Sequence, residues 1–288
     1  MNPEPMWLPL QAQYALANTD DDIASNIESA LKRHNHIGFQ SIMDTESGAV
    51  SVVGSGPSLK ENWKKLRDSD TDIIACNAAF QFLLERGIVP KYMFCFDADK
   101  LMLEFLTPRP DVTYLIASRC PPKAFEILEG CNVITVHAGG DLHIERLLQQ
   151  YNLMEPMVIG GSAAVTRAMC AAPVIGYTTV HLWGADGSFS DGDTHIRKST
   201  TDEKMMLIKL NERVFQMAPW MTRQVDDFKL LAPSLKALGI KLIVHGDGIL
   251  PHLAMTMGYQ TDKSTRLELF KAMVSGAKVK ARILWSHI

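Results

Sequence analysis

The sequence predicts an α/β protein built on a mostly parallel sheet with helices on both faces. Three observations lead to this prediction. From Ala49 onward, short runs of β-branched and aromatic residues alternate with longer stretches of helical periodicity. Runs such as 72–76 and 242–244 are apolar on both sides, as a sheet covered twice requires. With 288 residues, 47% of them hydrophobic, the chain can bury one large core.

The expected elements follow one another in a regular order. Strands are predicted at 49–53, 72–76, 92–96, 112–117, 132–136, 179–183 and 240–244. Helices are predicted at 58–68, 78–86, 122–129, 142–150, 161–173, 203–217 and 227–238. An amphipathic helix over Asp20–His34 precedes the core, and a basic helix over 262–281 follows it. We therefore expect an N-terminal helical extension (1–47), an α/β catalytic domain (48–258) and a C-terminal helical tail (259–288).

Composition narrows the classes of function. The net charge is −3, which provides no global basic field for a nucleic-acid backbone. The five cysteines are scattered without a C-x-x-C pair, which predicts reduced, buried thiols in place of a zinc site or disulfides. The N-terminus lacks the basic region of a signal peptide, and no apolar run approaches the roughly 20 residues that span a bilayer. We expect a cytoplasmic protein without membrane contact, of open oligomeric state.

The most informative segment is the turn after the first strand, Gly54-Ser55-Gly56-Pro57-Ser58. Glycines allow a tight turn and a close ligand, and the free N–H groups at a helix start bind anions. Ser58 and Glu61 also have the spacing of a capping box. The dinucleotide fingerprint would need a third glycine where Leu59 stands, and no P-loop string occurs. The segment therefore favours a phosphate-binding turn over a plain strand–helix connection.

A pair of carboxylates follows the third predicted strand. Asp97 and Asp99 have i, i+2 spacing at the strand tip, where both can turn toward one ion. Magnesium is commonly held by one or two carboxylates together with substrate phosphates. The alternative is that Asp99 caps a helix that begins at Lys100 and that Asp97 is hydrated in a turn. Beside a phosphate-type turn, the pair predicts a Mg²⁺ site.

Other strand ends and helix starts carry further candidates. Asn77 follows the second strand and can hold a nucleobase or ribose, or cap the next helix. The small residues Gly160, Gly161 and Ser162 suit a ligand at a helix start, or tight packing of that helix on the sheet. Asp186 and His195 belong to a polar region after the sixth strand, where His195 can donate a proton, bind phosphate or ligate a metal.

Taken together, these residues resemble the 6-hydroxymethylpterin diphosphokinase MptE-like family. The matching segments, in order over roughly 48–250, are Gly54-Ser55-Gly56-Pro57-Ser58-Leu59, Cys76-Asn77-Ala78-Ala79, Gly87-Ile88-Val89-Pro90, Gly160-Gly161-Ser162-Ala163, Gly184-Ala185-Asp186 and Thr194-His195. The resemblance implies a Rossmann-like fold and Mg²⁺-dependent transfer of a diphosphate from ATP to a reduced pterin. It implies that residues 54–58 cradle phosphates, that Asp97 and Asp99 carry the metal, and that Asp186 or His195 positions or deprotonates the acceptor hydroxyl.

The same scaffold is similar to bacterial sialyltransferases and to motility accessory factor glycosyltransferases, which use CMP-activated sugars. They share the glycine-rich turn, the Cys-Asn pair and a late helix–strand–turn like Val225 to Gly248. The sialyltransferases keep a catalytic histidine before that helix, where this chain has Met221, Thr222 and Arg223. A diphosphokinase-like transferase is therefore the leading expectation, a CMP-sugar glycosyltransferase the second, and a non-catalytic nucleotide-binding or assembly protein the third.

Overall fold

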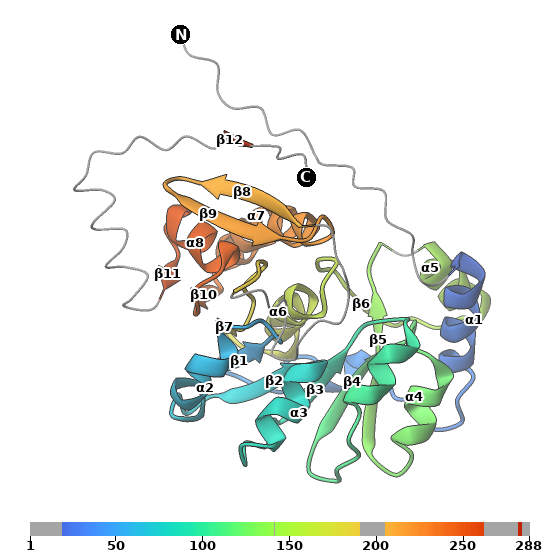
Figure 1. Ribbon diagram of the computed structural model, residues 1–288. Coiled ribbons are helices and arrows are strands. Elements are labelled where there is room, and N and C mark those ends of the chain that lie inside the picture. The colour runs from blue at the N-terminus through green and yellow to red at the C-terminus, as the bar shows by residue number, and fades with distance from the viewer. Residues whose placement is uncertain (1–18, 141, 191–204, 262–281, 284–288) are drawn as a thin grey trace.

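The computed structural model describes residues 19–140, 142–190, 205–261 and 282–283 (Figure 1). Within them, nine parallel strands form the main sheet. Across the sheet they are β11 (Gln260–Thr261), β10 (Lys241–Val244), β7 (Thr179–Trp183), β1 (Ala49–Val53), β2 (Asp72–Cys76), β3 (Tyr92–Cys95), β4 (Thr113–Ala117), β5 (Asn132–Ala138) and β6 (Met157–Val158).

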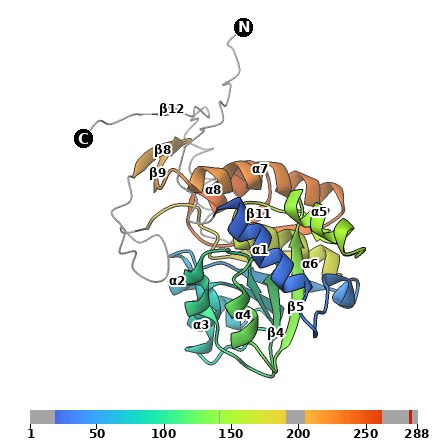
Figure 2. The same ribbon diagram turned by 90° about the vertical axis from the view of Figure 1, so that its right-hand side faces the viewer.

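Helices cover the sheet on both sides (Figures 1 and 2). In chain order they are α1 (Asp20–Leu31), α2 (Leu59–Arg67), α3 (Ala78–Leu84), α4 (Pro122–Ile127), α5 (Leu142–Gln150), α6 (Ala164–Ile175), α7 (Met221–Ala237) and α8 (Ile249–Thr256), with 3-10 turns η1 (Phe39–Ile42) and η2 (Lys100–Phe105). The strand order grows from β1 toward β6 on one side and from β7 toward β11 on the other. Right-handed crossovers on opposite sides of such a reversal place helices on opposite faces. The predicted Rossmann-like α/β fold is confirmed.

The strands are buried because both of their faces are apolar. Val50, Val52 and Val53 in β1 are fully buried, and so is Ile74 in β2. All five cysteines are free; Cys76, Cys95 and Cys120 are buried and the other two half-buried, as expected for structural thiols. No helix in the described residues is both long and apolar enough to cross a bilayer.

The helix α1 packs against the outside of the core. Thr19 and Asp22 form a capping box at its start, which satisfies two free N–H groups. Its buried stripe, which includes Ile27 and Leu31, lies against α4 and α5. The Asn26 amide also donates to the Arg119 carbonyl at 3.1 Å. The segment before β1 is thus part of the packed structure, while residues 1–18 and the predicted helix 262–281 lie outside the described residues.

The prediction of a helix over 203–217 is wrong. The chain instead forms an antiparallel hairpin of β8 (Met206–Leu210) and β9 (Arg213–Met217), extended by β12 (Arg282–Ile283). Asn211 adopts a left-handed φ of 57°, which allows the tight reversal between the strands. The Arg213 guanidinium pairs with Asp247 at 2.8 Å and so ties the hairpin to the turn after β10.

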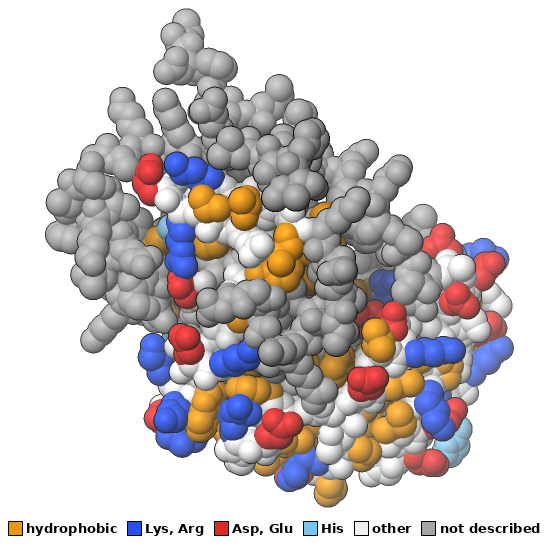
Figure 3. Space-filling view, viewed as in Figure 1, with side chains coloured by type: hydrophobic (Ala, Val, Ile, Leu, Met, Phe, Trp, Pro, Cys, Tyr) orange, Lys and Arg blue, Asp and Glu red, His pale blue; other side chains and the backbone are white. Residues whose placement is uncertain are grey.

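The structure corrects other boundaries as well. Helix α7 begins at Met221, six residues before its predicted start at 227. The short strands β6 and β11 and helix α8 had no counterpart in the sequence prediction. On the face shown in Figure 3, described acidic and basic side chains are interspersed, in keeping with the small net charge.

Candidate active site at the reversal of strand order

The glycine-rich turn after β1 lies directly against the turn after β7, where the strand order reverses. The Gly54 N–H donates to the Trp183 carbonyl at 2.8 Å, and the Gly56 N–H donates to the Gly184 carbonyl at 2.7 Å. A Cβ added to either Gly54 or Gly56 would lie 2.6 Å from the Gly184 oxygen. Both glycines are therefore needed for the close approach of two backbones. Ligands of open α/β sheets bind at such a reversal, beyond the carboxyl ends of the strands.

A buried carboxylate occupies the start of α2. The Ser58 N–H donates to Oδ2 of Asp186 at 2.7 Å, and the Ser58 hydroxyl donates to Oδ1 at 2.6 Å. The predicted capping box of Ser58 with Glu61 is therefore wrong, because the Ser58 side chain makes no capping bond within its own helix. Asp186 supplies the cap from another strand end. The position predicted for a phosphate thus holds a carboxylate of the chain.

The environment of Asp186 shifts its ionisation. Its side chain is almost fully buried, with 4% of the residue exposed. Burial raises the pKa of this carboxyl from 3.8 to about 6, although the hydrogen bonds from Ser58 oppose the shift. The nearby charges of Asp247 and Glu61 add to the increase. Near neutral pH, Asp186 is therefore a carboxylate that accepts a proton readily.

Asn77 stands on a sharp turn between β2 and α3. Its backbone has φ 48° and ψ −126°, outside the regions that non-glycine residues favour. The side chain makes no capping bond to α3, and its Oδ1 atom is buried without a hydrogen-bond partner. The capping alternative for Asn77 is therefore wrong. Strained backbone and unpaired buried acceptors concentrate at functional sites, because each costs free energy.

Asp97 and Asp99 follow β3, two strands from β1. Oδ1 of Asp97 accepts the Asp99 N–H at 3.0 Å, and Oδ1 of Asp99 accepts the Leu101 N–H at 2.8 Å. Asp99 therefore caps the turn η2, as the alternative interpretation expected. Each carboxylate uses one oxygen in these bonds, and Asp97 is exposed. The structure therefore shows the capping role of Asp99, and the Mg²⁺ site at this pair stays a prediction.

The Gly160–Ser162 turn is held by side chains of the protein. The Ser162 N–H and hydroxyl both donate to Oδ2 of Asp227 at 2.6 Å. The buried Arg167 donates to three carbonyls of this turn and of β6, and its guanidinium lies 4.2 Å from the Phe96 ring centre. A Cβ on Gly160 would lie 2.7 Å from the Arg167 Cα. The packing of α6 against this turn explains why its residues are small. The Ser162 N–H group, which was predicted to bind a ligand, donates its hydrogen bond to Asp227 instead.

The turn after β10 completes this end of the sheet, and the sequence interpretation assigned it no residue. The His245 ring stacks on Trp183 with centroids 3.5 Å apart, and its Nε2 lies 3.0 Å from Nδ1 of His181. A Cβ on Gly246 would lie 3.1 Å from Oδ1 of Asp186. The sequence feature that could have indicated this turn was the H-G-D-G string directly after a predicted strand. Its placement beside Asp186 depends on the strand order.

The structure thus gathers most of the predicted residues along one edge of the sheet. Asp186, residues 54–58, Asn77 and Asp97 follow β7, β1, β2 and β3, which are neighbours in that order. The Gly160–Ser162 turn precedes α6, which packs on β1, β2 and β3. The predicted residue His195 lies outside the described residues.

Comparison with solved structures places this edge in a known fold. The structure of a MAf glycosyltransferase from Magnetospirillum magneticum AMB-1 is similar with a TM-score of 0.61 at 16% identity, covering 91% of this chain and 42% of that chain. The chain therefore spans less than half of that protein. A mammalian sialyltransferase in complex with Gal-beta-1-3GalNAc-ortho-nitrophenol has a TM-score of 0.40 at 12% identity, covering 80% and 88% of the two chains.

No curated protein matches the sequence. A family model does match, over residues 21–192, which is more than half of the chain. The match begins inside α1 and includes the turns that carry Gly54, Asn77, Asp97 and Asp186. The family match supports a nucleotide-related transferase. The chain belongs to the 6-hydroxymethylpterin diphosphokinase MptE-like family.

Proposed function

We propose that this protein is a Mg²⁺-dependent transferase that moves a diphosphate from ATP to the hydroxymethyl group of a small, pterin-type acceptor. Membership of the MptE-like family supports this activity. The donor phosphates would bind along the edge formed by β1, β2 and β3, where the predicted residues gather. Neighbouring strands are about 4.8 Å apart, so the turns after β1 and β3 are about 10 Å apart with Asn77 between them.

Asn77 is the observation that carries the proposal. Its strained backbone and its unpaired Oδ1 both cost folding free energy, and the side chain makes no capping bond to α3 that would offset this cost. A donor group on the nucleotide, such as a ribose hydroxyl, would pair with that oxygen. The position midway between the glycine-rich turn and the two aspartates suits contact with a nucleotide that spans them.

Asp97 and Asp99 fit the ion that the family implies. Their carboxylates are oxygen ligands, and the hydrogen bonds to backbone N–H groups fix one oxygen of each while the other stays available. When bound, Mg²⁺ would neutralise phosphate charge as the transfer proceeds. The protein's own part is to hold these oxygens at the end of β3, next to the position proposed for the nucleotide.

Asp186 is the proposed general base. Its pKa of about 6 lies close to the working pH, which suits a group that takes a proton from the acceptor hydroxyl. The hydroxyl oxygen would then bond to the β-phosphorus of ATP, the bond from that phosphorus to the α-phosphate oxygen would break, and AMP would leave. In the structure both oxygens of Asp186 accept hydrogen bonds from Ser58, so the acceptor hydroxyl would bind beside this carboxylate in its buried position.

The test is AMP release from ATP with a reduced hydroxymethylpterin, with and without Mg²⁺. We expect Asp97→Asn combined with Asp99→Asn to lower the rate by at least about 100-fold, because the charge that holds the ion is lost. Glu129→Gln, an exposed acid at the end of α4, is the matched control and should leave the rate unchanged. Unchanged Mg²⁺-dependent turnover in the double variant would refute the assignment of these two residues.

A CMP-sugar glycosyltransferase is the second candidate. The similarity to the MAf glycosyltransferase covers 91% of the chain, a larger share than the family match over residues 21–192. Selective stabilisation by CMP without Mg²⁺, together with no AMP release from ATP, would favour this function. Nucleotide binding without either turnover would favour a non-catalytic binding protein.

A further inference from the structure

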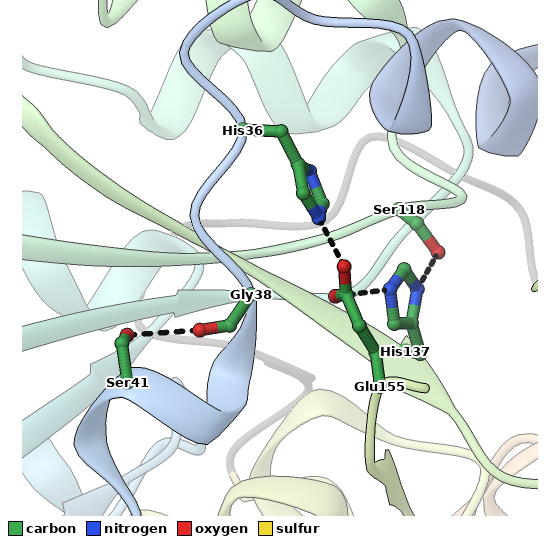
Figure 4. A network of polar contacts seen from close by, with 6 residues as sticks. All are labelled: His36, Gly38, Ser41, Ser118, His137 and Glu155. Atoms are coloured by element: carbon green, nitrogen blue, oxygen red, sulfur yellow. Dashed lines mark hydrogen bonds and ion pairs between the residues drawn. The ribbon is translucent and has the colours of Figure 1, made fainter. Parts of the chain in front are cut away.

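A second group of polar side chains lies at β5, two strands beyond the end of the proposed nucleotide edge at β3. His36, His137 and Glu155 come from three separate segments and converge on one another (Figure 4). One ligand-type atom of each side chain lies within 4.8 Å of those of the other two. Among the described residues, this is the one group of three or more His, Cys, Asp or Glu side chains that meets this distance limit. It is placed at β5, two strands or about 10 Å from β3 and four strands or about 19 Å from β1.

The chain path explains why these segments meet. The outer edge of β5 is covered first by the segment before η1, where Gly38 bridges Thr135, and then by β6, where Met157 pairs with His137. His36 precedes the first of these contacts, and Glu155 precedes the second. A Cβ on Gly38 would overlap a Glu155 carboxylate oxygen, so the absent side chain makes room for that carboxylate.

The two imidazole rings each face one oxygen of the Glu155 carboxylate. Oε1 of Glu155 lies 2.7 Å from Nε2 of His36, and its Oε2 lies 3.0 Å from Nε2 of His137. His137 is fully buried, and the side chains of Glu155 and His36 are 5% and 13% exposed. Ligand-type side chains from three separate segments thus meet at one nearly buried position.

The arrangement has the features of a metal site beyond its three ligands. Nδ1 of His137 lies 3.0 Å from the Ser118 hydroxyl, which fixes the ring and leaves Nε2 to face the cluster (Figure 4). A ligand histidine is normally held in this way through its other nitrogen. Two ligands of one tetrahedral ion, each about 2.05 Å from it, are about 3.3 Å apart. The observed separations of 2.7 and 3.0 Å would need to open by only about 0.3–0.6 Å.

We propose that His36, His137 and Glu155 bind a divalent transition-metal ion of zinc type, with a water molecule as the fourth ligand. Two imidazoles and one carboxylate are borderline donors that suit zinc and its first-row neighbours in preference to magnesium. The ion fastens the segment before η1, and with it α1, to the outer edge of β5. This assignment does not depend on the transferase reaction.

The test is metal binding by the full chain after treatment with a chelator and dialysis against buffered zinc. We expect one zinc per chain and a rise in Tm of about 5 °C at a hundredfold excess over Kd. Magnesium at the same concentration as zinc should leave the cluster empty. His36→Gln and Glu155→Gln should each weaken zinc binding by at least about 100-fold, and Ser118→Ala by about 10-fold, since loss of a ligand costs more than loss of its support.

The matched control is His34→Gln, which removes an exposed histidine two residues from His36 and should leave zinc affinity unchanged. Gly38→Ala is a second test variant. Its backbone suits alanine, and the new methyl would displace only the ends of the Gln40 and Glu155 side chains. It should keep the fold, as judged by circular dichroism, and lose tight zinc binding. Equal zinc affinity in wild type, His36→Gln and Gly38→Ala would overturn the proposal, whatever the outcome for AMP release.

Discussion

At the scale of single residues, Asp186 shows how burial turns a helix cap into a pH-sensitive group. Its pKa in the folded chain, about 6, exceeds its ordinary value of 3.8. Between these values the folded chain binds more protons than the unfolded chain, so its stability falls as the pH rises from about 4 to about 6. The full shift corresponds to up to about 3 kcal/mol. The loss of folding stability that comes from burying the charged carboxylate is therefore present at neutral pH and absent in acid.

Asp186→Asn removes this titration. We expect the unfolding free energy of the variant, relative to wild type, to increase by up to about 3 kcal/mol from pH 4 to pH 7. Denaturant unfolding at several pH values measures it. A pH-independent difference for Asp186→Asn would mean that the buried carboxyl has an ordinary pKa.

Asn77 is the second residue whose energetics point to function. Asn77→Gly relieves a positive φ and removes an unpaired buried oxygen, and we expect it to stabilise the fold by about 1 kcal/mol. The same change should weaken ATP binding by about 10-fold, since one hydrogen bond to the nucleotide is lost. Asn152→Gly, at another left-handed position that is exposed, is the control for relief of strain alone. Calorimetric titration with unchanged ATP affinity would contradict the role of Asn77.

At the scale of elements, the contact between the turns after β1 and β7 fixes the geometry of the proposed site. Gly54→Ala places a methyl 2.6 Å from the Gly184 carbonyl oxygen and 3.1 Å from Val165. Backbone atoms cannot rotate away, so we expect a loss of stability of about 3 kcal/mol. Gly87→Ala also replaces a turn glycine but meets open space, and it should cost about 1 kcal/mol through its positive φ alone. Equal Tm values for the two variants would refute the overlap.

The hairpin of β8 and β9 shows where local pattern failed. Met206, Leu207, Ile208 and Leu210 are apolar enough to fit a helical stripe, and methionine and leucine favour helices. The structure pairs this run with 213–217 across the Asn211 turn, so cross-strand contacts outweighed propensity. The elements with β-branched runs between glycine or polar turns, such as β1, β2 and β7, were predicted with their observed bounds.

At the scale of the whole molecule, strand order decides which residues become neighbours. The sequence identified Asn77, Asp97 and Asp186 as strand-end residues, and a parallel sheet brings all of them to one edge. It did not show that β7 returns to lie beside β1, which is what brings Asp186 onto Ser58. Nor did it bring His36, His137 and Glu155 together, since 119 residues separate the first from the last.

The sequence by itself determined the α/β class, the main strands and the family resemblance, because hydrophobic periodicity and turn residues are local signals. The tertiary structure alone decided what the glycines and carboxylates touch. Glycines for a ligand and glycines for close backbone packing look the same in a sequence, and only long-range contacts showed Gly54 and Gly56 packed against Gly184. A helix start accepts any carboxylate that reaches it, and which one does so depends on the path of the whole chain.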